Sequence, residues 1–425
     1  MHKWSVWLLA LAAPLVLTAC GERLDSGAAC PALCSGESLA LKDTTLEAIV
    51  LDTTLSGFPP RGSSNLLTLT NSGDTADVRY IVRFDSVISS YMSGADTVLI
   101  TAVDSAYLRI AIEAGLSRFS APVVFEAYDV DTDAVDSVTS TLLPLFTPGR
   151  LIGTVTVDSA SLKDSVRLFL NNGAVAGKLA NGERLRIGVR VTSAQPVRIA
   201  VLSANTTEPP LLRFDPAPAD TTIGFMTLPP RSRTPAGEAR IALDFTDYNV
   251  VAAGQPPLPP DVIGVGGPRG RRAYFRFAIP ARITDSTTVI RAALVLTQRP
   301  APTYGFTDSI IVAPQVVIAT KDIIDLSKAA MITDTIRAQA RPDIFQLPSL
   351  LMPPTGTVAR NFDIGKVVRF WHSTTAERVP QAIVLRSTME GIGPVEAQFY
   401  STDAPVGLRP RLIITYLPRS EFGIP

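Results

Sequence analysis

Apolar and polar residues alternate over long stretches of this chain, and this period of two constrains its fold more than any other feature. The clearest stretches are 77–87 (DVRYIVRFDSV), 184–193 (RLRIGVRVTS), 274–279 (YFRFAI) and 409–416 (RPRLIITY). In the first, Val78, Tyr80 and Val82 would lie on one face of a strand, with Arg79 and Arg83 on the other. Such alternation is typical of β-strands that have one face in a core and one in water.

Turn-forming segments separate these apolar stretches. They lie at 71–74 (NSGD), 171–173 (NNG), 255–260 (QPPLPP) and 264–270 (GVGGPRG). Helical periodicity is scarce, and the best candidate helix is 321–339. Together with 34 prolines and only 18% charged residues, this spacing predicts an all-β fold of antiparallel sandwiches. The glycine-rich 264–270 precedes a strand pattern instead of a helix, so we interpret it as a hairpin turn and not a phosphate loop.

The chain also repeats itself. Blocks recur in the same order: Val82–Phe84 with Phe275–Phe277, Ala102–Ile112 with Ile290–Gln298, Val166–Phe169 with Val368–Trp371, Pro196–Ser203 with Pro394–Ser401, and Pro210–Asp215 with Pro410–Tyr416. The repeat predicts two copies of one unit, β-sandwich domain 1 at 41–216 and β-sandwich domain 2 at 222–418, each of ordinary domain size. The join between them is rich in Pro and Asp, as a domain boundary is expected to be.

The first twenty residues have the layout of an export signal. The basic His2 and Lys3 precede an apolar run, 4–18, that is short for a membrane span. The run ends in Leu-Thr-Ala-Cys, which resembles the lipobox of bacterial lipoproteins. The resemblance implies a signal peptide at 1–19, a lipid on Cys20 that anchors the protein to a membrane, and a tether at 20–40.

This resemblance has consequences for location. Each buried methylene contributes about 0.8 kcal/mol, so two or more acyl chains anchor a protein stably. The mature chain would therefore work outside the cytoplasm, in the cell envelope. Gly21 stands where an Asp would favour the inner membrane, so the outer membrane is favoured if the organism has one. The alternatives are an ordinary secretory signal with an incidental cysteine and an uncleaved anchor helix.

The cysteine and charge content limits which chemistry and which binding partners we expect. Cys30 and Cys34 form a CPALC pair that, in an oxidising compartment, predicts a local disulfide. Redox motifs usually have two intervening residues instead of three, and no histidine lies nearby to complete a zinc site. The 39 basic residues balance the 39 acidic ones, and no basic stretch indicates a nucleic-acid footprint.

Three motifs in each copy resemble the DNRLRE-type module, a jelly-roll-like β-sandwich related to disaggregatase and found on secreted and surface proteins. They are RFDSV (83–87) and RFAIP (276–280), TAVDSAYLRI (101–110) and TVIRAALVLT (288–297), and a terminal strand best seen in STDAPVGLRPRLIITY (401–416). The first copy lacks the final tyrosine, and neither copy has the W-x-E and T-W segments of such modules. The resemblance implies two tandem antiparallel jelly-roll-like β-sandwich domains with a role in adhesion or glycan attachment.

Candidate catalytic residues are few. His372 is the one histidine after the predicted signal, no G-x-S-x-G elbow is present, and a histidine-rich metal site is excluded. We expect His372 at a strand end with no catalytic role. Trp371 aligns with Phe169 in the repeat, and paired positions of this kind favour core residues over a sugar-binding platform.

The run DVDTDAVD is the best candidate ion site. Asp129, Asp131 and Asp133 alternate in a loop, where their carboxylates could converge on calcium, the one cofactor we consider. The EF-hand pattern fails, because Ala134 stands where glycine is needed and Ser140 where the bidentate glutamate is needed. The alternative is a solvated acidic loop.

We therefore expect a non-enzymatic, lipid-anchored protein that binds or scaffolds at the cell envelope. The expected partners are a polysaccharide or an envelope protein. One alternative is an assembly subunit or spacer whose sheet edges pair with other subunits. The other is a hydrolase with a carboxylate site between the domains.

Overall fold

The fold is mostly β, with antiparallel sheets, in the part of the chain that the structure describes. The computed structural model describes residues 41–134, 138–158, 162–217, 224–232, 245–317, 347–372 and 381–418. Every pairing between its strands is antiparallel, so the predicted all-β class is confirmed. The predicted signal peptide, the tether, all three cysteines and the candidate helix 321–339 lie outside the described residues. None of the described helices is long and apolar enough to cross a membrane.

The first sheet pair encloses one hydrophobic core. Its larger sheet runs β12 (Val197–Leu202), β3 (Leu66–Asn71), β4 (Asp77–Phe84), β11 (Leu185–Ser193), β8 (Val123–Asp129) and β9 (Leu151–Val157), with β15 (Asp247–Ala253) also on β4. Its smaller sheet runs β10 (Ser165–Phe169), β7 (Ala102–Ala111), β13 (Leu211–Ala217) and β14 (Met226–Leu228). The inward side chains of both sheets are fully buried between them, Val82, Phe125, Leu108 and Phe214 among them.

The second sheet pair encloses another core. One sheet runs β1 (Lys42–Leu46), β24 (Arg411–Pro418), β18 (Thr287–Arg299), β23 (Glu396–Tyr400) and β16 (Val262–Gly266), with β21 (Ala359–Asp363) also on β18. The other runs β2 (Ile49–Leu55), β17 (Arg272–Phe277), β22 (Ala382–Ser387), β19 (Ile310–Val316) and β20 (Leu350–Met352). Phe275, Leu294 and Leu412 are fully buried in this core.

The remaining elements are short. They are the hairpin β5 (Ser90–Ser93) and β6 (Asp96–Leu99), the α-helices α2 (Thr139–Leu142), α3 (Asn172–Ala180), α4 (Ala281–Thr284) and α7 (Gly365–His372), and the 3-10 helices η1 (Ala114–Leu116), η2 (Leu143–Leu145), η3 (Pro148–Arg150) and η4 (Val406–Leu408). Segment 264–270 turns back on itself, with the Gly266 and Arg271 backbones hydrogen-bonded to each other. The predicted hairpin turn at this glycine-rich segment is therefore confirmed.

The two sheet pairs share one order of elements. The series β3, β4, β7, β8, β9, β10, α3, β11, β12, β13 recurs as β16, β17, β18, β19, β20, β21, α7, β22, β23, β24. The registers agree as well. Leu108 on β7 lies between Leu168 and Leu212, and Leu294 on β18 lies between Phe362 and Leu412 in the same way. All of these side chains are fully buried.

One of the predicted sequence correspondences is wrong. Val166–Phe169 forms strand β10, whereas Val368–Trp371 lies in helix α7, so the expected strand there is a helix. The structural counterpart of β10 is β21, and α7 is the counterpart of α3. A short apolar run fits a helix or a strand equally well, and here the buried side chains of Val367, Val368 and Trp371 follow helical spacing.

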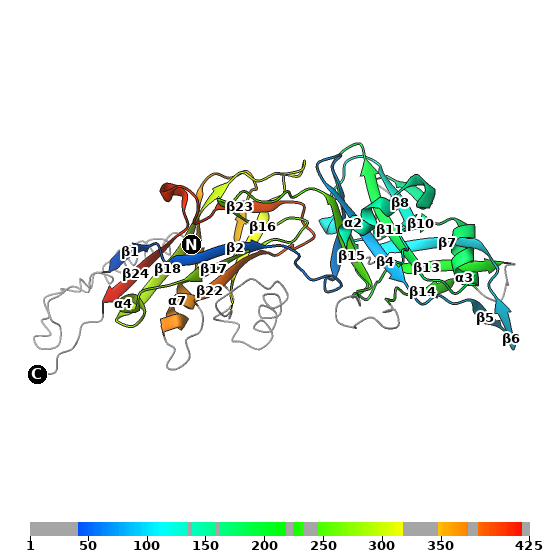
Figure 1. The fold of residues 1–425 in the computed structure, drawn as a ribbon, viewed down its shortest axis with the longest axis horizontal. Helices are drawn as coiled ribbons and strands as arrows, with labels where there is room; N and C mark the ends of the chain where they lie inside the picture. Colours follow the sequence, from blue (N-terminus) through cyan, green and yellow to red (C-terminus); the bar gives the residue numbers. More distant parts are fainter. Residues whose placement is uncertain are drawn as a thin grey trace, which may run out of the picture. The chain divides into compact units, whose positions relative to one another are not determined.

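Strand pairing crosses the predicted domain boundaries. β1 and β2, which precede β3 in the chain, pair with β24 and β17 of the second sheet pair. β14 and β15, which precede β16, pair with β13 and β4 of the first. In Figure 1 the dark-blue β1 and β2 lie among strands coloured from green to red. The first sheet pair is thus built from a continuous run of strands, and the N-terminal strands complete the second. The division into domains at 41–216 and 222–418 stays a prediction.

Candidate functional site

The outer face of the smaller sheet of the first pair carries aromatic and arginine side chains. Leu168, Leu108 and Leu212 lie side by side and point into the core, so the residues next to them in sequence point outward. These outward residues form a row across β10, β7 and β13. Four of them are Tyr107, Arg167, Phe169 and Arg213. Phe225, which directly precedes β14, contacts Tyr107 on the same side. We call these five residues the aromatic–arginine face.

The rings of this face contact one another. The ring centroid of Tyr107 lies 5.8 Å from that of Phe169 and 5.5 Å from that of Phe225, the latter in an edge-to-face arrangement. Phe169 is 55% exposed and Phe225 is 41% exposed, while Tyr107 is buried beneath them. Two exposed rings that both contact Tyr107 make this face our candidate binding surface.

Two arginines border the rings. The Arg167 Cζ lies 5.7 Å from the Tyr107 ring centroid, and the Arg213 Cζ lies 5.9 Å from the centroids of Tyr107 and Phe225. Among the described residues, neither guanidinium has a carboxylate within ion-pair distance, and the buried Nε of Arg213 has no hydrogen-bond partner. The next arginine on the same face, Arg109, is bonded to Glu208 at 3.2 Å. Within the described residues, the patch therefore offers two cations without acidic partners.

The second sheet pair has no equivalent patch in its described part. The positions that match Phe169, Tyr107 and Arg213 in register are Asp363, Ala293 and Ile413. None of these three is aromatic or basic. The aromatic–arginine face is thus a property of one copy of the scaffold and does not follow from the scaffold itself.

The predicted ion site is filled by cations of the protein. Asp131 accepts a hydrogen bond of 2.6 Å from Arg184 Nε and lies 3.3 Å from Lys178 Nζ, which is also 3.9 Å from Asp129. Asp133 lies 3.3 Å from Arg184. Burial acts to lower the pKa of Lys178, but the charges of Asp129 and Asp131 outweigh it and raise that pKa. The calcium hypothesis stays a prediction, since in the described ranges no three carboxylates, histidines or cysteines converge as metal ligands.

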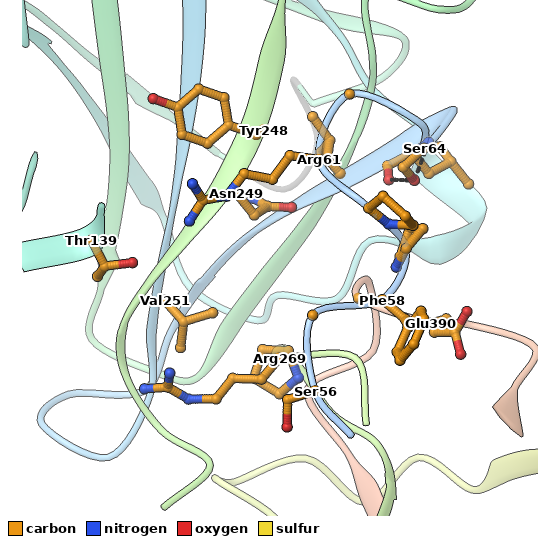
Figure 2. Close-up of a pocket in the computed structure, with 18 residues that line it drawn as sticks. Ser56, Phe58, Arg61, Ser64, Thr139, Tyr248, Asn249, Val251, Arg269 and Glu390 are labelled. Atoms are coloured by element: carbon orange, nitrogen blue, oxygen red, sulfur yellow. Dashed lines mark hydrogen bonds between the residues drawn. The ribbon is translucent and has the colours of Figure 1, made fainter. Parts of the chain in front are cut away.

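A hollow of about 280 Å³ lies beside β15 and the segment that joins β2 to β3. Figure 2 shows Arg61 and Asn249 near its centre, with Tyr248 and Glu390 toward opposite sides. Glu390 accepts two hydrogen bonds of 2.7 Å from Arg272 and lies 3.3 Å from Arg386. Asn249 bonds to both backbone polar groups of Thr68. The polar groups of Asn249 and Glu390 thus serve to hold the structure together.

Carboxylates line this hollow and two further ones, one of them of about 610 Å³ at Asp129, Asp131 and Asp133, and the hydrolase alternative stays a prediction. Glu390 is the one carboxylate among the described lining residues of the first hollow. A second hollow, of about 350 Å³, is lined by Asp52 and Asp403, and Asp52 accepts hydrogen bonds from the backbone N–H and hydroxyl of Thr402. His372 ends helix α7 and does not follow a strand as expected.

Sequence reasoning missed the aromatic–arginine face. The faulty match of Phe169 with Trp371 assigned both to the core, whereas Trp371 is 6% exposed and Phe169 is mostly exposed. The signal was present in the alternation of 166–170 (VRLFL), where Phe169 occupies the same outward phase as Arg167. An aromatic residue in the polar phase of a strand predicts a ring on the outer face of the sheet.

Comparison with known proteins does not assign this chain to a family. The sequence matches no protein-family model and no curated protein. Among solved structures, the C-terminal domain of the Streptococcus pyogenes antigen I/II-family protein AspA is 9% identical, covers 83% of this chain and 91% of its own, and has a TM-score of 0.14. T=1 particles derived from infectious bursal virus give 9% identity, 88% and 75% coverage, and a TM-score of 0.10. Scores this low carry no argument about fold or function.

Proposed function

We propose that this chain is a lipid-anchored, extracytoplasmic protein that binds an acidic polysaccharide of the cell envelope without cleaving it. The observation that carries the proposal is the aromatic–arginine face, where two arginines without described acidic partners border exposed rings. Arg167 is exposed and Arg213 is half-buried, so both guanidinium groups are accessible to an anion from outside the chain.

The chemistry of the face fits a chain of acidic sugars. Sugar rings expose C–H groups that pack on aromatic faces, here those of Phe169 and Phe225. The planar guanidinium groups of Arg167 and Arg213 match the geometry of a carboxylate and can bind it through two parallel hydrogen bonds. Because Arg213 already lies against rings, little side-chain freedom is lost when it binds.

The remaining parts of the proposal come from the sequence. Cys20 would carry the lipid, and residues 20–40 would separate the membrane from β1. The resemblance to the DNRLRE-type module supports a role in glycan attachment. The paired states of Glu390 and Asp131 are consistent with carboxylates that stabilise the fold and do not act on a substrate.

The test is a binding titration with defined polymers. The full chain with Cys20→Ser, which removes the lipid site, is titrated with polygalacturonate and with neutral dextran of similar length. We expect binding to polygalacturonate that weakens as salt rises, because salt screens surface charge. Phe169→Ala should weaken it by about tenfold, as expected for loss of an exposed ring at a binding surface. Equal binding to both polymers, or no effect of Phe169→Ala, would contradict the proposal.

A further inference from the structure

The two sheet pairs are completed by equivalent strand pairs that come from different places in the chain. β14 lies on the edge of β13 with Leu228 opposite Leu212, and β1 lies on the edge of β24 with Leu46 opposite Leu412. β15 pairs with β4, and β2 pairs with the equivalent β17. The strand pairs β1–β2 and β14–β15 therefore occupy the same two positions of a duplicated scaffold.

An aspartate fixes each strand pair in the same way. Asp247 of β15 lies opposite Val82, and its Oδ2 accepts a hydrogen bond of 2.7 Å from the backbone N–H of Ala204. Asp52 of β2 lies opposite Phe275, and its Oδ2 accepts one of 2.8 Å from the backbone N–H of Thr402. This shared bond shows that the strand pairs are equivalent in detail.

The serine before each of these donors repeats as well. Ser203 donates its backbone N–H to the carbonyl of Asn65 at 3.0 Å, and Ser401 donates to that of Asp261 at 2.8 Å. Each serine hydroxyl also accepts the N–H two residues further on, at 3.1 Å in both cases. The site that receives the aspartate is thus built identically in both copies.

The connections to these strand pairs differ. β14 follows β13 after a short segment, so β14–β15 completes the first sheet pair from the adjoining chain. β2 ends at Leu55, and the whole first sheet pair intervenes before β17 begins at Arg272. The β1–β2 strand pair is therefore separated from the sheets that it completes by a whole folded sheet pair, whereas β14 is joined directly to β13.

The segment after β2 joins the two sheet pairs and is the part of the chain that would have to change direction in an exchange. Its start is held on the second sheet pair, where the Gly57 N–H donates to Arg269 at 2.7 Å and the Phe58 ring lies 3.8 Å from the Arg272 Cζ. A side chain at Gly270 would clash with the backbone of Phe58, which passes directly over this glycine. Beyond Pro59 and Pro60, the carbonyl of Gly62 accepts a hydrogen bond from Asn205 of the first sheet pair.

We propose that β1–β2 also inserts into the second sheet pair of another copy of this chain, so that molecules associate by exchanging this strand pair. Exchange keeps every hydrogen bond of β1 and β2 and changes only which molecule supplies them. The balance between the closed monomer and the exchanged form therefore depends on concentration and on the joining segment 56–65. This proposal is independent of the polysaccharide site, which lies on strands that do not exchange.

Cross-linking between differently marked chains tests the exchange. The background is the full chain with Cys20→Ser, Cys30→Ser and Cys34→Ser. One chain carries Thr45→Cys on β1, and the other carries Ile413→Cys, its direct partner on β24. The two are unfolded together, refolded over a range of concentrations and oxidised. Directly paired strand positions lie within the distance that a disulfide spans.

The first sheet pair supplies a matched control. Thr227 on β14 and Arg213 on β13 are the counterparts of Thr45 and Ile413, and their strands are joined by a short segment. We expect cross-linked heterodimer from Thr45→Cys with Ile413→Cys, at least about tenfold more than from Thr227→Cys with Arg213→Cys, because the short connection keeps β14 close to β13 of its own chain.

Three outcomes overturn the proposal. The first is no heterodimer when a single chain carrying both Thr45→Cys and Ile413→Cys cross-links within itself. The second is equal heterodimer from the control pair, which indicates non-specific oxidation. The third is failure of the doubly substituted chain to cross-link, which removes the strand pairing on which the proposal rests.

Discussion

The two sheet pairs share the same arrangement of strands and the same buried registers, but they differ in the residues on their outer faces. Around Leu108 and Leu294 the buried registers agree residue by residue, and the aspartates Asp247 and Asp52 fix equivalent strands. The outward positions have diverged, because Tyr107 of the first pair is replaced by Ala293 in the second. Inward residues are constrained by packing on both sides, whereas outward ones are free to take up function.

The largest expected effect tests whether the two cores are separate. Leu108→Ala and Leu294→Ala each remove a fully buried side chain at equivalent positions, so each should cost about 2–5 kcal/mol. In chemical denaturation followed by fluorescence and circular dichroism, each variant should shift a different transition. If both variants shift one shared transition equally, the two sheet pairs unfold as one unit and the comparison between separate copies fails.

The next effect concerns the aspartate of the exchanged strand. Asp52→Ala leaves the N–H and hydroxyl of Thr402 without their acceptor, which should cost about 1–3 kcal/mol. The loss should appear in the transition that Leu294→Ala shifts. Asp43→Ala removes an exposed carboxylate that accepts from Thr415 on the same edge, and it serves as the control with a smaller effect. Equal losses in the two variants would argue against a special role for Asp52.

Asp247 should behave differently with pH. Burial raises the pKa of Asp247 to about 6, against the opposing hydrogen bonds from Ala204 and Tyr80. The folded state therefore holds this proton more tightly than the unfolded state. Its contribution to stability is most favourable below the unfolded value of 3.8 and is lost as pH rises toward 6, by at most about 3 kcal/mol.

The measurement is the stability difference between Asp247→Asn and the wild type at pH 7 and at pH 4. The amide cannot ionise, so the variant should gain stability relative to the wild type as pH rises between these values. A difference that stays constant with pH would show that Asp247 does not titrate in this window.

The next prediction concerns the transfer of the aromatic–arginine face to the second sheet pair. Ala293→Tyr, Asp363→Phe and Ile413→Arg together place a ring, a second ring and a guanidinium at the matching positions of the second sheet pair. With a short oligogalacturonate, the stoichiometry by titration calorimetry should rise from one to about two per chain. The reversed set on the first pair, Tyr107→Ala with Phe169→Asp and Arg213→Ile, should abolish binding. Unchanged stoichiometry in a folded transplant would show that these three residues are insufficient.

The smallest expected effect is that of calcium. The ion must displace Lys178 and Arg184 from Asp131, so we expect calcium to stabilise the chain by less than about 1 kcal/mol. Thermal unfolding with calcium, with magnesium as control, measures this. A large shift that Asp131→Asn abolishes would instead establish the calcium site predicted from the sequence.

The sequence predicts much of the scaffold but little of its assembly. Alternation identifies strands such as 77–84, because the period of two follows directly from strand geometry. The match of Pro210 with Pro410 also survives in the structure as β13 and β24. The run 368–371 misleads, because apolar residues at that density suit a helix as well as a strand.

The alternation of residues does not predict which strands pair with each other or which side chains meet on the surface. Nothing in the sequence of β2 tells whether it pairs with β4 or with β17, since both present similar alternating faces. The aromatic–arginine face depends on Phe225, which is distant in sequence from Tyr107 and reaches it only through the pairing of β13 with β14. Register of this kind is set by the tertiary structure.

The most direct test of the central claim compares Arg213→Gln with Ile413→Gln in binding to polygalacturonate. The two substitutions place the same residue at matching positions of the two sheet pairs. Arg213→Gln should weaken binding by about tenfold or more and reduce its salt dependence, while Ile413→Gln should leave the affinity unchanged. Equal affinities of both variants and the wild type would contradict a binding site on the aromatic–arginine face.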